Sequence, residues 1–500
     1  MPTTPRTTTT PATFDATTAP ASEAAADLLL LPIFEGLKPG PGLKEVSKAL
    51  RTDLVRTAKD HGFEGKPGEA LALPSLGAIP ARTVVLVGAG PQKTAGQTEV
   101  RRAAMTGTRA AKRFASVAST LPQVGGSTRF SARAFAEGVL LGAYRFEEYK
   151  SKPEARATLA TVTALVERDP SAAARALDTG RIHGEASNWT RDLVNTPAAD
   201  LTPTRLAEVA QAMAKRHGLE CKVWNRAALG KGGFGGILAV GRGSANDPVM
   251  IELSYRGAAN AKPYAITGKG ITFDAGGLFI KKAKWMETMK DDMAGAAATL
   301  AVMRAAAELG LRLNLIAAIG SAENMPSGSA TRPGDVVTHR GGKTSEVTDP
   351  DAEGRVLLAD VLAYLSEKKP RCIIDSATLT GTGLGEDLWA GFANDQKLMD
   401  DLRAAGEQAG EPGWQLPLWK PYDRHNKSEV ADVKNADWTG ADTLSAGLFL
   451  QHFVGKTPWA HLDVGDTANL EDERDEWPAG PTGCPARTLI RYLENQERRR

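Results

Sequence analysis

Short apolar runs that end at glycine or at a polar residue, and that alternate with helical segments, constrain the fold of this chain most strongly. Residues 83–90 read Thr-Val-Val-Leu-Val-Gly-Ala-Gly, a β-branched run closed by glycines that suits a buried parallel strand. Because strands that alternate with helices favour parallel sheets, we expect an α/β fold with mainly parallel sheets flanked by helices. The other predicted strands cover residues 248–255, 264–267, 313–319, 372–375 and 460–464, and the predicted helices between them cover 202–217, 293–309 and 354–367.

The length of the chain predicts more than one domain, because its 500 residues exceed what a single hydrophobic core usually organises. Residues 1–26 are rich in Thr, Ala and Pro and poor in large apolar side chains, so we expect a disordered tail there. We expect a small N-terminal α/β domain over residues 27–175 and a larger C-terminal α/β domain over residues 180–495. Within the first domain, Ala-rich stretches predict helices at residues 103–118, 132–143 and 155–168.

The charge and the cysteine content of the chain indicate where the protein is located and which partners it is expected to bind. The 61 basic and 59 acidic residues leave a net charge of +2, which gives no overall attraction to nucleic acid or to an anionic membrane. No apolar run approaches the roughly 20 residues that a membrane-spanning helix needs. The three cysteines are far apart and form no C-x-x-C pair, which indicates reduced thiols. We therefore expect a cytoplasmic protein with no membrane partner, for which nucleic acid is a disfavoured partner.

Several familiar catalytic motifs are absent from the sequence. It has no H-E-x-x-H pair of zinc ligands and no G-x-S-x-G nucleophile turn. Two Gly-Lys-Thr triplets, at residues 342–344 and 455–457, lack the glycine that a phosphate-binding loop carries five positions earlier, where Val337 and Leu450 stand. The seven histidines are scattered. His461, inside a predicted strand, is expected to be a core residue or a residue that supports the ligands from behind, and not a metal ligand. Histidine-based metal chemistry therefore has little support.

One segment combines charge and glycine in an unusual way. Residues 268–281 read Gly-Lys-Gly-Ile-Thr-Phe-Asp-Ala-Gly-Gly-Leu-Phe-Ile-Lys, which places Lys269, Asp274 and Lys281 around glycines just after a predicted strand. Glycine is used where the backbone turns sharply or approaches a ligand closely. Because ligands of parallel α/β sheets collect at the carboxyl ends of strands, this segment is the first candidate for a functional site.

Acidic residues before two predicted helices complete the candidate site. Asp291 and Asp292 precede one helix, and Asp349, Asp351 and Glu353 stand at every second position before the next. Each has an ordinary alternative role, either at the positive end of a helix dipole or in a turn or cap. Together, however, these carboxylates and the two lysines lie in three loops that can meet at one sheet edge. Buried like charges are costly unless a cation binds among them, so we predict a site for divalent metal, of the kind that hydrolases build from two ions.

These motifs resemble those of the leucine aminopeptidase, or cytosol aminopeptidase, family. The resemblance is carried by residues 269–281, by Met-Lys-Asp-Asp-Met at 289–293, by Asp-Ala-Glu-Gly-Arg at 351–355 and by Ala-Thr-Leu-Thr-Gly at 377–381. It extends over essentially all of residues 180–490. It implies a two-domain α/β metallopeptidase that removes the N-terminal residue from peptides, with a leucine-like preference, and that assembles as a homohexamer.

The resemblance also implies a role for each residue of the candidate site. Two of them would not bind metal: Lys281 would polarise the scissile carbonyl, and Arg355 would hold a bicarbonate ion that acts as general base, together with backbone groups at Gly354 and Leu379. A water molecule activated by both metals would be the nucleophile. The ligands of two divalent ions, Zn²⁺ or Mn²⁺, would be Lys269, Asp274, Asp292, Asp351 and Glu353.

The chain departs from the family pattern beside these ligands. Asp349-Pro350 stands where the family has Asn-Thr, which adds a carboxyl group and removes a backbone donor. All seven candidate chemistry residues are retained, so we expect an active enzyme. Two alternatives stay open from the sequence: an additional DNA-binding or regulatory role, and a different two-metal hydrolase such as a phosphoesterase.

Overall fold

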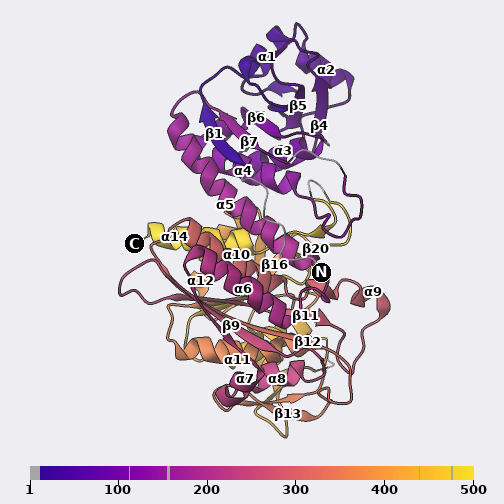
Figure 1. Ribbon diagram of the computed structural model, residues 1–500, viewed down its shortest axis with the longest axis vertical. Helices are drawn as coiled ribbons and strands as arrows, with labels where there is room; N and C mark the ends of the chain where they lie inside the picture. The colour runs from indigo at the N-terminus through magenta and orange to yellow at the C-terminus, as the bar shows by residue number, and fades with distance from the viewer. Residues whose placement is uncertain (1–11, 112, 155–157, 438–439, 475–476, 500) are drawn as a thin grey trace. The chain divides into compact units, whose positions relative to one another are not determined.

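The computed structural model describes residues 12–499 except 112, 155–157, 438–439 and 475–476 (Figure 1). The chain divides into two compact units. The N-terminal unit comprises Met1–Asn188 with Glu473–Pro478, and the C-terminal unit comprises Trp189–Asp472 with Ala479–Arg500. Each unit contains a mainly parallel sheet with helices, which confirms the predicted α/β fold class. The boundary that we expected between residues 175 and 180 falls inside helix α5 (Pro170–Asn195).

The N-terminal unit is built on one sheet with helices on both faces. Side chains alternate along its central strand: Leu29 and Leu31 share a core with residues of α1 and α2, whereas Leu28 and Leu30 share a core with residues of α3 and α4. A strand buried on both faces is what parallel pairing requires. The parallel strands lie in the order β1 (Thr13–Thr17), β7 (Thr161–Leu165), β6 (Ser116–Ser119), β2 (Leu28–Phe34) and β5 (Thr83–Gly88), with β4 (Ala70–Pro74) antiparallel to β5 and β3 (Lys38–Pro39) antiparallel to β2. The helices are α1 (Leu43–Ala49), α2 (Leu54–Asp60), α3 (Gln97–Arg109), α4 (Thr128–Ala143) and the 3-10 turns η1 (Ala21–Glu23) and η2 (Leu121–Gln123).

Three predictions for this unit are wrong in part. The segment 155–168, predicted to be helical, contains strand β7, because its Thr-Val-Thr-Ala-Leu run inserts between β1 and β6. The helix predicted at 103–118 ends at Arg109 as α3, and the stretch from Ser116 is β6. The tail predicted to be disordered through residue 26 includes strand β1, where Phe14 packs against the core and the backbone pairs with β7. Residues 1–11 lie outside the described part of the chain.

The C-terminal unit has a larger sheet whose central strands β19, β15, β10 and β12 run parallel. The strands predicted at these positions are confirmed. Antiparallel strands flank the four parallel ones on both sides. The order is β17 (Gly413–Gln415), β16 (Trp389–Ala393), β19 (Trp459–Asp463), β15 (Ile373–Ala377), β10 (Tyr264–Gly268), β12 (Asn314–Asn324), β9 (Val249–Arg256) and β8 (Glu220–Trp224), with β11 (Gly270–Asp274) beside β12. Smaller sheets are formed by β13 (Asp335–Thr338), β14 (Thr344–Val347) and β18 (Val433–Lys434), and by β20 (Asn469–Leu470) and β21 (Gly480–Pro481).

Helices cover both faces of this larger sheet. Figure 1 shows α6 and α10 on one side of β9, with α14 packed against α10, and α11 on the other side. The predicted helices at 202–217, 293–309 and 354–367 are confirmed as α6, α10 and α11. The helices and 3-10 turns of the unit are α6 (Pro203–His217), α7 (Arg226–Gly232), α8 (Gly235–Gly241), α9 (Ala283–Met286), η3 (Met289–Asp291), α10 (Ala294–Glu308), α11 (Glu353–Glu367), α12 (Gln396–Ala409), η4 (Lys420–Asn426), α13 (Asp442–Gln451) and α14 (Ala486–Arg498).

Close packing of α10 on the sheet depends on two glycines. A Cβ atom added at Gly268 would lie 2.0 Å from the carbonyl carbon of Gly295, and one added at Gly295 would lie 2.0 Å from the carbonyl oxygen of Ser376. The beginning of α10 therefore sits directly against the carboxyl ends of β10 and β15, which is where ligands of such sheets bind. Among the described residues, no helix is both long enough and apolar enough to cross a membrane.

Candidate active site

The carboxyl ends of the central strands bring the predicted site residues together. Lys269 lies between β10 and β11, and Asp274 is the last residue of β11. Asp292 follows η3 directly and is separated from α10 by Met293, and Glu353 is the first residue of α11. With Asp351 and Lys281, these residues form a single lysine–carboxylate cluster. Each lysine makes two ion pairs, and the carboxylates of Asp274, Asp351 and Glu353, whose oxygens lie within 4.8 Å of one another, connect the two groups.

Lys269 holds one half of the cluster. Its Nζ lies 2.6 Å from Asp292 Oδ1 and 2.8 Å from Glu353 Oε1, and it donates to the carbonyl oxygen of Thr378 at 3.0 Å. The Thr378 hydroxyl in turn donates to Asp292 Oδ1 at 2.8 Å. The Lys269 side chain is 4% exposed, so these contacts fix its amine within the protein interior.

Lys281 holds the other half. Its Nζ lies 2.8 Å from Asp274 Oδ2 and 2.7 Å from Asp351 Oδ1. The second oxygen of Asp274 accepts from the Gly276 amide at 2.9 Å and from Asn324 Nδ2 at 2.8 Å. Gly276 has a φ of +85°, and a Cβ atom there would lie 2.2 Å from the Phe279 carbonyl oxygen, so this turn requires glycine.

Burial and charge set the protonation of the cluster. Burial opposes the charged form of Lys269, but the carboxylates of Asp292 and Glu353 outweigh it and raise the pKa of Lys269. Burial raises the pKa of the Asp351 carboxyl to about 7, and the negative charge of Asp274 adds to this effect. Burial also raises the pKa values of Asp292 and Glu353. Bound cations would stabilise the ionised form of such carboxyl groups.

The donor set fits divalent metal. Carboxylate oxygens of Asp274, Asp351 and Glu353 all lie within 4.8 Å of one another. The buried Oδ2 of Asp292 has no hydrogen-bond donor among the described residues. The four carboxylates of the cluster outnumber its two ammonium groups, so the ionised cluster carries an excess of negative charge. Buried carboxylates in excess of their cationic partners are the groups that metal ions neutralise in proteins.

Arg355 lies beside the cluster on α11. Its guanidinium donates from Nη1 to the Asn435 carbonyl oxygen at 2.7 Å, and its buried Nε has no acceptor among the described residues. Burial lowers the pKa of Arg355, opposed by the negative charges of Asp442 and Glu353. Gly354 packs directly against the Lys269 side chain, since an added Cβ would lie 2.5 Å from Lys269 Cε.

Two buried polar side chains organise the surroundings and were not singled out from the sequence. Asp463, at the end of β19, accepts from the amides of Leu379 and Thr380 at 3.1 and 3.4 Å. Asn324, at the end of β12, donates to both Asp274 Oδ1 and the Pro350 carbonyl oxygen. Asp463 lies near the end of the predicted strand 460–464, and Asn324 lies five residues beyond the predicted strand 313–319. This closeness to strand ends was the available signal, because strand ends meet at this edge. His461 is buried against Asp375, 2.5 Å from Nδ1 to Oδ1, which confirms it as a core residue.

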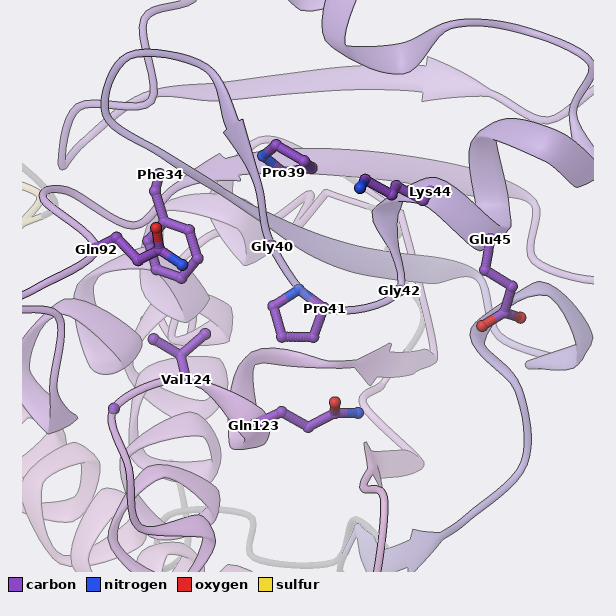
Figure 2. A pocket seen from close by; sticks show the side chains of 11 residues that line it. Phe34, Pro39, Gly40, Pro41, Gly42, Lys44, Glu45, Gln92, Gln123 and Val124 are labelled. Atoms are coloured by element: carbon purple, nitrogen blue, oxygen red, sulfur yellow. The ribbon is translucent and has the colours of Figure 1, made fainter.

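The N-terminal unit has a separate crevice, about 620 Å³ in volume (Figure 2). Phe34 lines it from the end of β2, Gln92 from the loop after β5 and Gln123 from η2, and Lys44 and Glu45 line it from α1. The Glu45 carboxylate is engaged by the backbone amide and hydroxyl of Ser22. This mixed lining of amides and opposite charges does not specify a ligand class, so the lysine–carboxylate cluster is the candidate active site.

Comparisons with known proteins agree with this location. Residues 188–490 match the model of the cytosol aminopeptidase family catalytic domain, and residues 30–153 match that of the family's N-terminal domain. A probable cytosol aminopeptidase from Roseiflexus castenholzii is 43% identical over 484 residues, covering 94% of this chain and 96% of the relative.

Two solved structures are similar over nearly their whole length. The bottromycin maturation enzyme BotP in complex with Mn has a TM-score of 0.84 and 38% identity, covering 95% of this chain and 100% of its own. A mutant of tomato leucine aminopeptidase has a TM-score of 0.88 and 29% identity, covering 98% of each chain. The two family models and these structures cover both the N-terminal and the C-terminal parts of the chain.

Proposed function

The chain belongs to the cytosol aminopeptidase family, and from this membership and the geometry of the cluster we propose how its site works. The protein is a metal-dependent aminopeptidase that hydrolyses the N-terminal residue from peptides. We propose that two divalent ions are held by five side chains. The observation that carries the proposal is the meeting of these side chains, from three segments of the chain, at the carboxyl edge of one sheet. The proposed ligands are Lys269, Asp274, Asp292, Asp351 and Glu353.

The contacts support a division of the ligands between two ions. Asp274 and Glu353 would bridge the ions, Asp351 would complete one site, and Lys269 and Asp292 would complete the other. In agreement with this, the Lys269 amine contacts Asp292 and Glu353, whereas Asp351 faces Asp274 across Lys281. As a ligand, Lys269 would bind through its neutral amine and would release its proton. The bound ions would supply an activated water as nucleophile.

Lys281 is proposed to act on the substrate without binding metal. Burial opposes its charged form, but Asp274 and Glu353 outweigh burial and raise its pKa, so the amine stays protonated near neutral pH. A fixed ammonium group of this kind can polarise the scissile carbonyl and stabilise the oxyanion that develops on it. Asp292, beside the proposed position of the substrate's free amine, would select peptides with an unblocked N-terminus.

Arg355 is proposed to hold bicarbonate, the general base of the reaction. Its buried Nε, free of acceptors among the described residues, supports the binding of a small anion there. Gly354 and Leu379 would contribute backbone contacts.

Further properties are proposed from the relatives alone. The metals would be Zn²⁺ or Mn²⁺, the second supported by the Mn complex of BotP. The name of the relatives supports a cytoplasmic location, and family membership supports a homohexamer and a leucine-like preference. We also propose that the two compact units described above are the two functional domains.

A reloading experiment tests the proposal. Chelator-stripped protein supplied with Zn²⁺ or Mn²⁺ should cleave leucine p-nitroanilide and should leave the N-acetylated analogue intact. Lys281→Met should lower kcat by about 10²–10³-fold, the usual effect of removing an oxyanion donor, without changing the metal content. The neighbouring exposed lysine gives a matched control, Lys282→Met, which should keep wild-type turnover. Failure to cleave with either metal, or an equal turnover of the two variants, would refute the assigned roles.

A further inference from the structure

Asn435 occupies a central position next to the metal ligands, although it lies about 80 residues away from them in sequence. It follows β18, which runs parallel to β14, and its amide continues this ladder by donating to the Glu346 carbonyl oxygen at 3.0 Å. Its side chain is completely buried. The chain that leaves β14 forms the ligand loop, residues 348–352, which contains Asp351 and leads into α11.

The Asn435 side chain binds the backbone of the ligand loop at both ends. Its Oδ1 accepts from the amides of Thr348 and Asp349 at 2.8 and 3.2 Å, and from the Thr348 hydroxyl at 3.2 Å. Its Nδ2 donates to the carbonyl oxygens of Asp349 and Ala352 at 2.6 and 3.1 Å. Both amide hydrogens and both oxygen lone pairs are therefore used. No other orientation of the side chain would make as many hydrogen bonds.

The ligand loop has few other restraints that could place Asp351. Pro350 has no backbone donor, and it restricts the preceding Asp349 to extended geometry. Asn324 holds the Pro350 carbonyl oxygen at 2.9 Å, and the Asp349 carboxylate accepts from the Asp351 amide at 2.8 Å. The Ala352 amide donates to the Asp349 carbonyl oxygen at 3.2 Å. The Asn435 side chain binds the Thr348 and Asp349 amides and the Asp349 and Ala352 carbonyl oxygens, so the direction of these four groups depends on it.

The backbone of Asn435 makes a second connection, because its carbonyl oxygen accepts from Arg355 Nη1 at 2.7 Å. One residue thus joins the loop that carries a proposed metal ligand to the arginine proposed to hold the base. The Lys269–Asp292 half of the cluster has no contact with Asn435 in the described structure and is held by Thr378 instead.

We propose that Asn435 is a positioning residue, which fixes Asp351 and Arg355 relative to each other and thereby sets the affinity of one metal site and not of the other. The proposal rests on the proposed function, because it uses the division of ligands given above. Removing the partner that orients a metal ligand typically lowers metal affinity by about 10–100-fold. The effect of losing Asn435 should be confined to the ion that Asp351 completes, since Lys269 and Asp292 keep their own contacts.

The test is a titration of metal-free protein with Mn²⁺ alone. Binding is measured by calorimetry and by the EPR signal of the free ion. In Asn435→Ala, one of the two binding steps should weaken by about 10–100-fold while the other keeps its wild-type constant. The matched control is Asn314→Ala. Asn314 also bridges a loop, accepting from the Ala258 amide and donating to the Ala261 carbonyl oxygen, but at the amino end of β12. This control should bind both ions normally.

Thr348→Val keeps the design informative if Asn435→Ala does not fold. It removes only the hydroxyl bonds to Asn435 Oδ1 and to the Ala436 carbonyl oxygen, and it should weaken the same step to a smaller degree. Unchanged binding of both ions by the Asn435 and Thr348 variants, or equal weakening of both steps, would overturn the proposal. A wild-type protein that binds two ions but releases no amino acid would count against the proposed function instead, so the two failures are distinguishable.

Discussion

Gly354 provides the sharpest test of the way this site is packed. It lies in α11, and a Cβ atom at this position would stand 2.5 Å from Lys269 Cε, 2.8 Å from Cδ and 2.9 Å from Nζ. Carbon atoms in ordinary contact are about 3.5–4.0 Å apart, so Gly354→Ala requires the end of the lysine to move by about 1 Å. Lys269 is buried and its amine already has three oxygen partners, so it has no solvent space into which it can swing.

The size of the effect follows from the tolerance of metal sites. Ligand distances in such sites hold to within about 0.2 Å, so a displacement of about 1 Å takes the Lys269 amine out of range. We expect metal affinity to fall by about 10–100-fold, equivalent to about 1.4–2.8 kcal/mol. In metal-free protein, overpacking should cost about 1–3 kcal/mol, offset in part by about 0.4–1 kcal/mol from replacing glycine in a helix.

The assay pairs metal titration with urea unfolding of the metal-free protein. Gly230→Ala is the matched control, because this helical glycine in α7 has no atom within 4 Å of an added Cβ. The control should gain about 0.4–1 kcal/mol of stability and should bind metal normally. If Gly354→Ala binds both ions as tightly as the control does, the Lys269 amine is not confined as described and the packing argument fails.

Two further predictions concern stability. Burial opposes the charged form of His461, but the carboxylate of Asp375 outweighs it and raises the pKa of His461. The protonated pair therefore contributes stability that is complete below pH about 6.5, and this stability is lost as the pH rises through the higher pKa of the folded state. We expect the difference in unfolding free energy between wild type and His461→Gln to decrease as the pH rises from about 5 to about 9, as measured by urea unfolding. A difference that stays constant with pH would contradict the pairing. In the N-terminal unit, Glu137 accepts from Arg101 Nε at 2.7 Å and from Arg133 Nε at 3.1 Å with all three side chains buried. Glu137→Ala should cost about 3–5 kcal/mol of unfolding free energy, because it removes the carboxylate that two buried guanidinium groups share. A loss below about 1 kcal/mol would contradict this role of Glu137.

Local pattern accounts for the elements that the sequence predicted correctly. Strand β10 is marked by its apolar run, and helix α6 is marked by Thr202 at its beginning and Gly218 at its end. These signals act between residues that are close in sequence, so a short stretch of sequence is enough to predict both elements. Thr202 accepts from the Arg205 amide and Gly218 has a φ of +70°. The exceptions have a non-local cause: β1 has few apolar residues and gains its place by pairing with β7, about 150 residues later.

The sequence by itself determined which chemistry is available: lysines and carboxylates after strands and before helices, in the pattern of a metal site. Only the tertiary structure decided how they pair, with Lys269 on Asp292 and Glu353 and Lys281 on Asp274 and Asp351. It also decided that Asn435 would support the ligand loop. The physical reason is that residue type and helix or strand periodicity are local properties, whereas contact between distant segments depends on strand order, which is selected by the packing of the whole sheet.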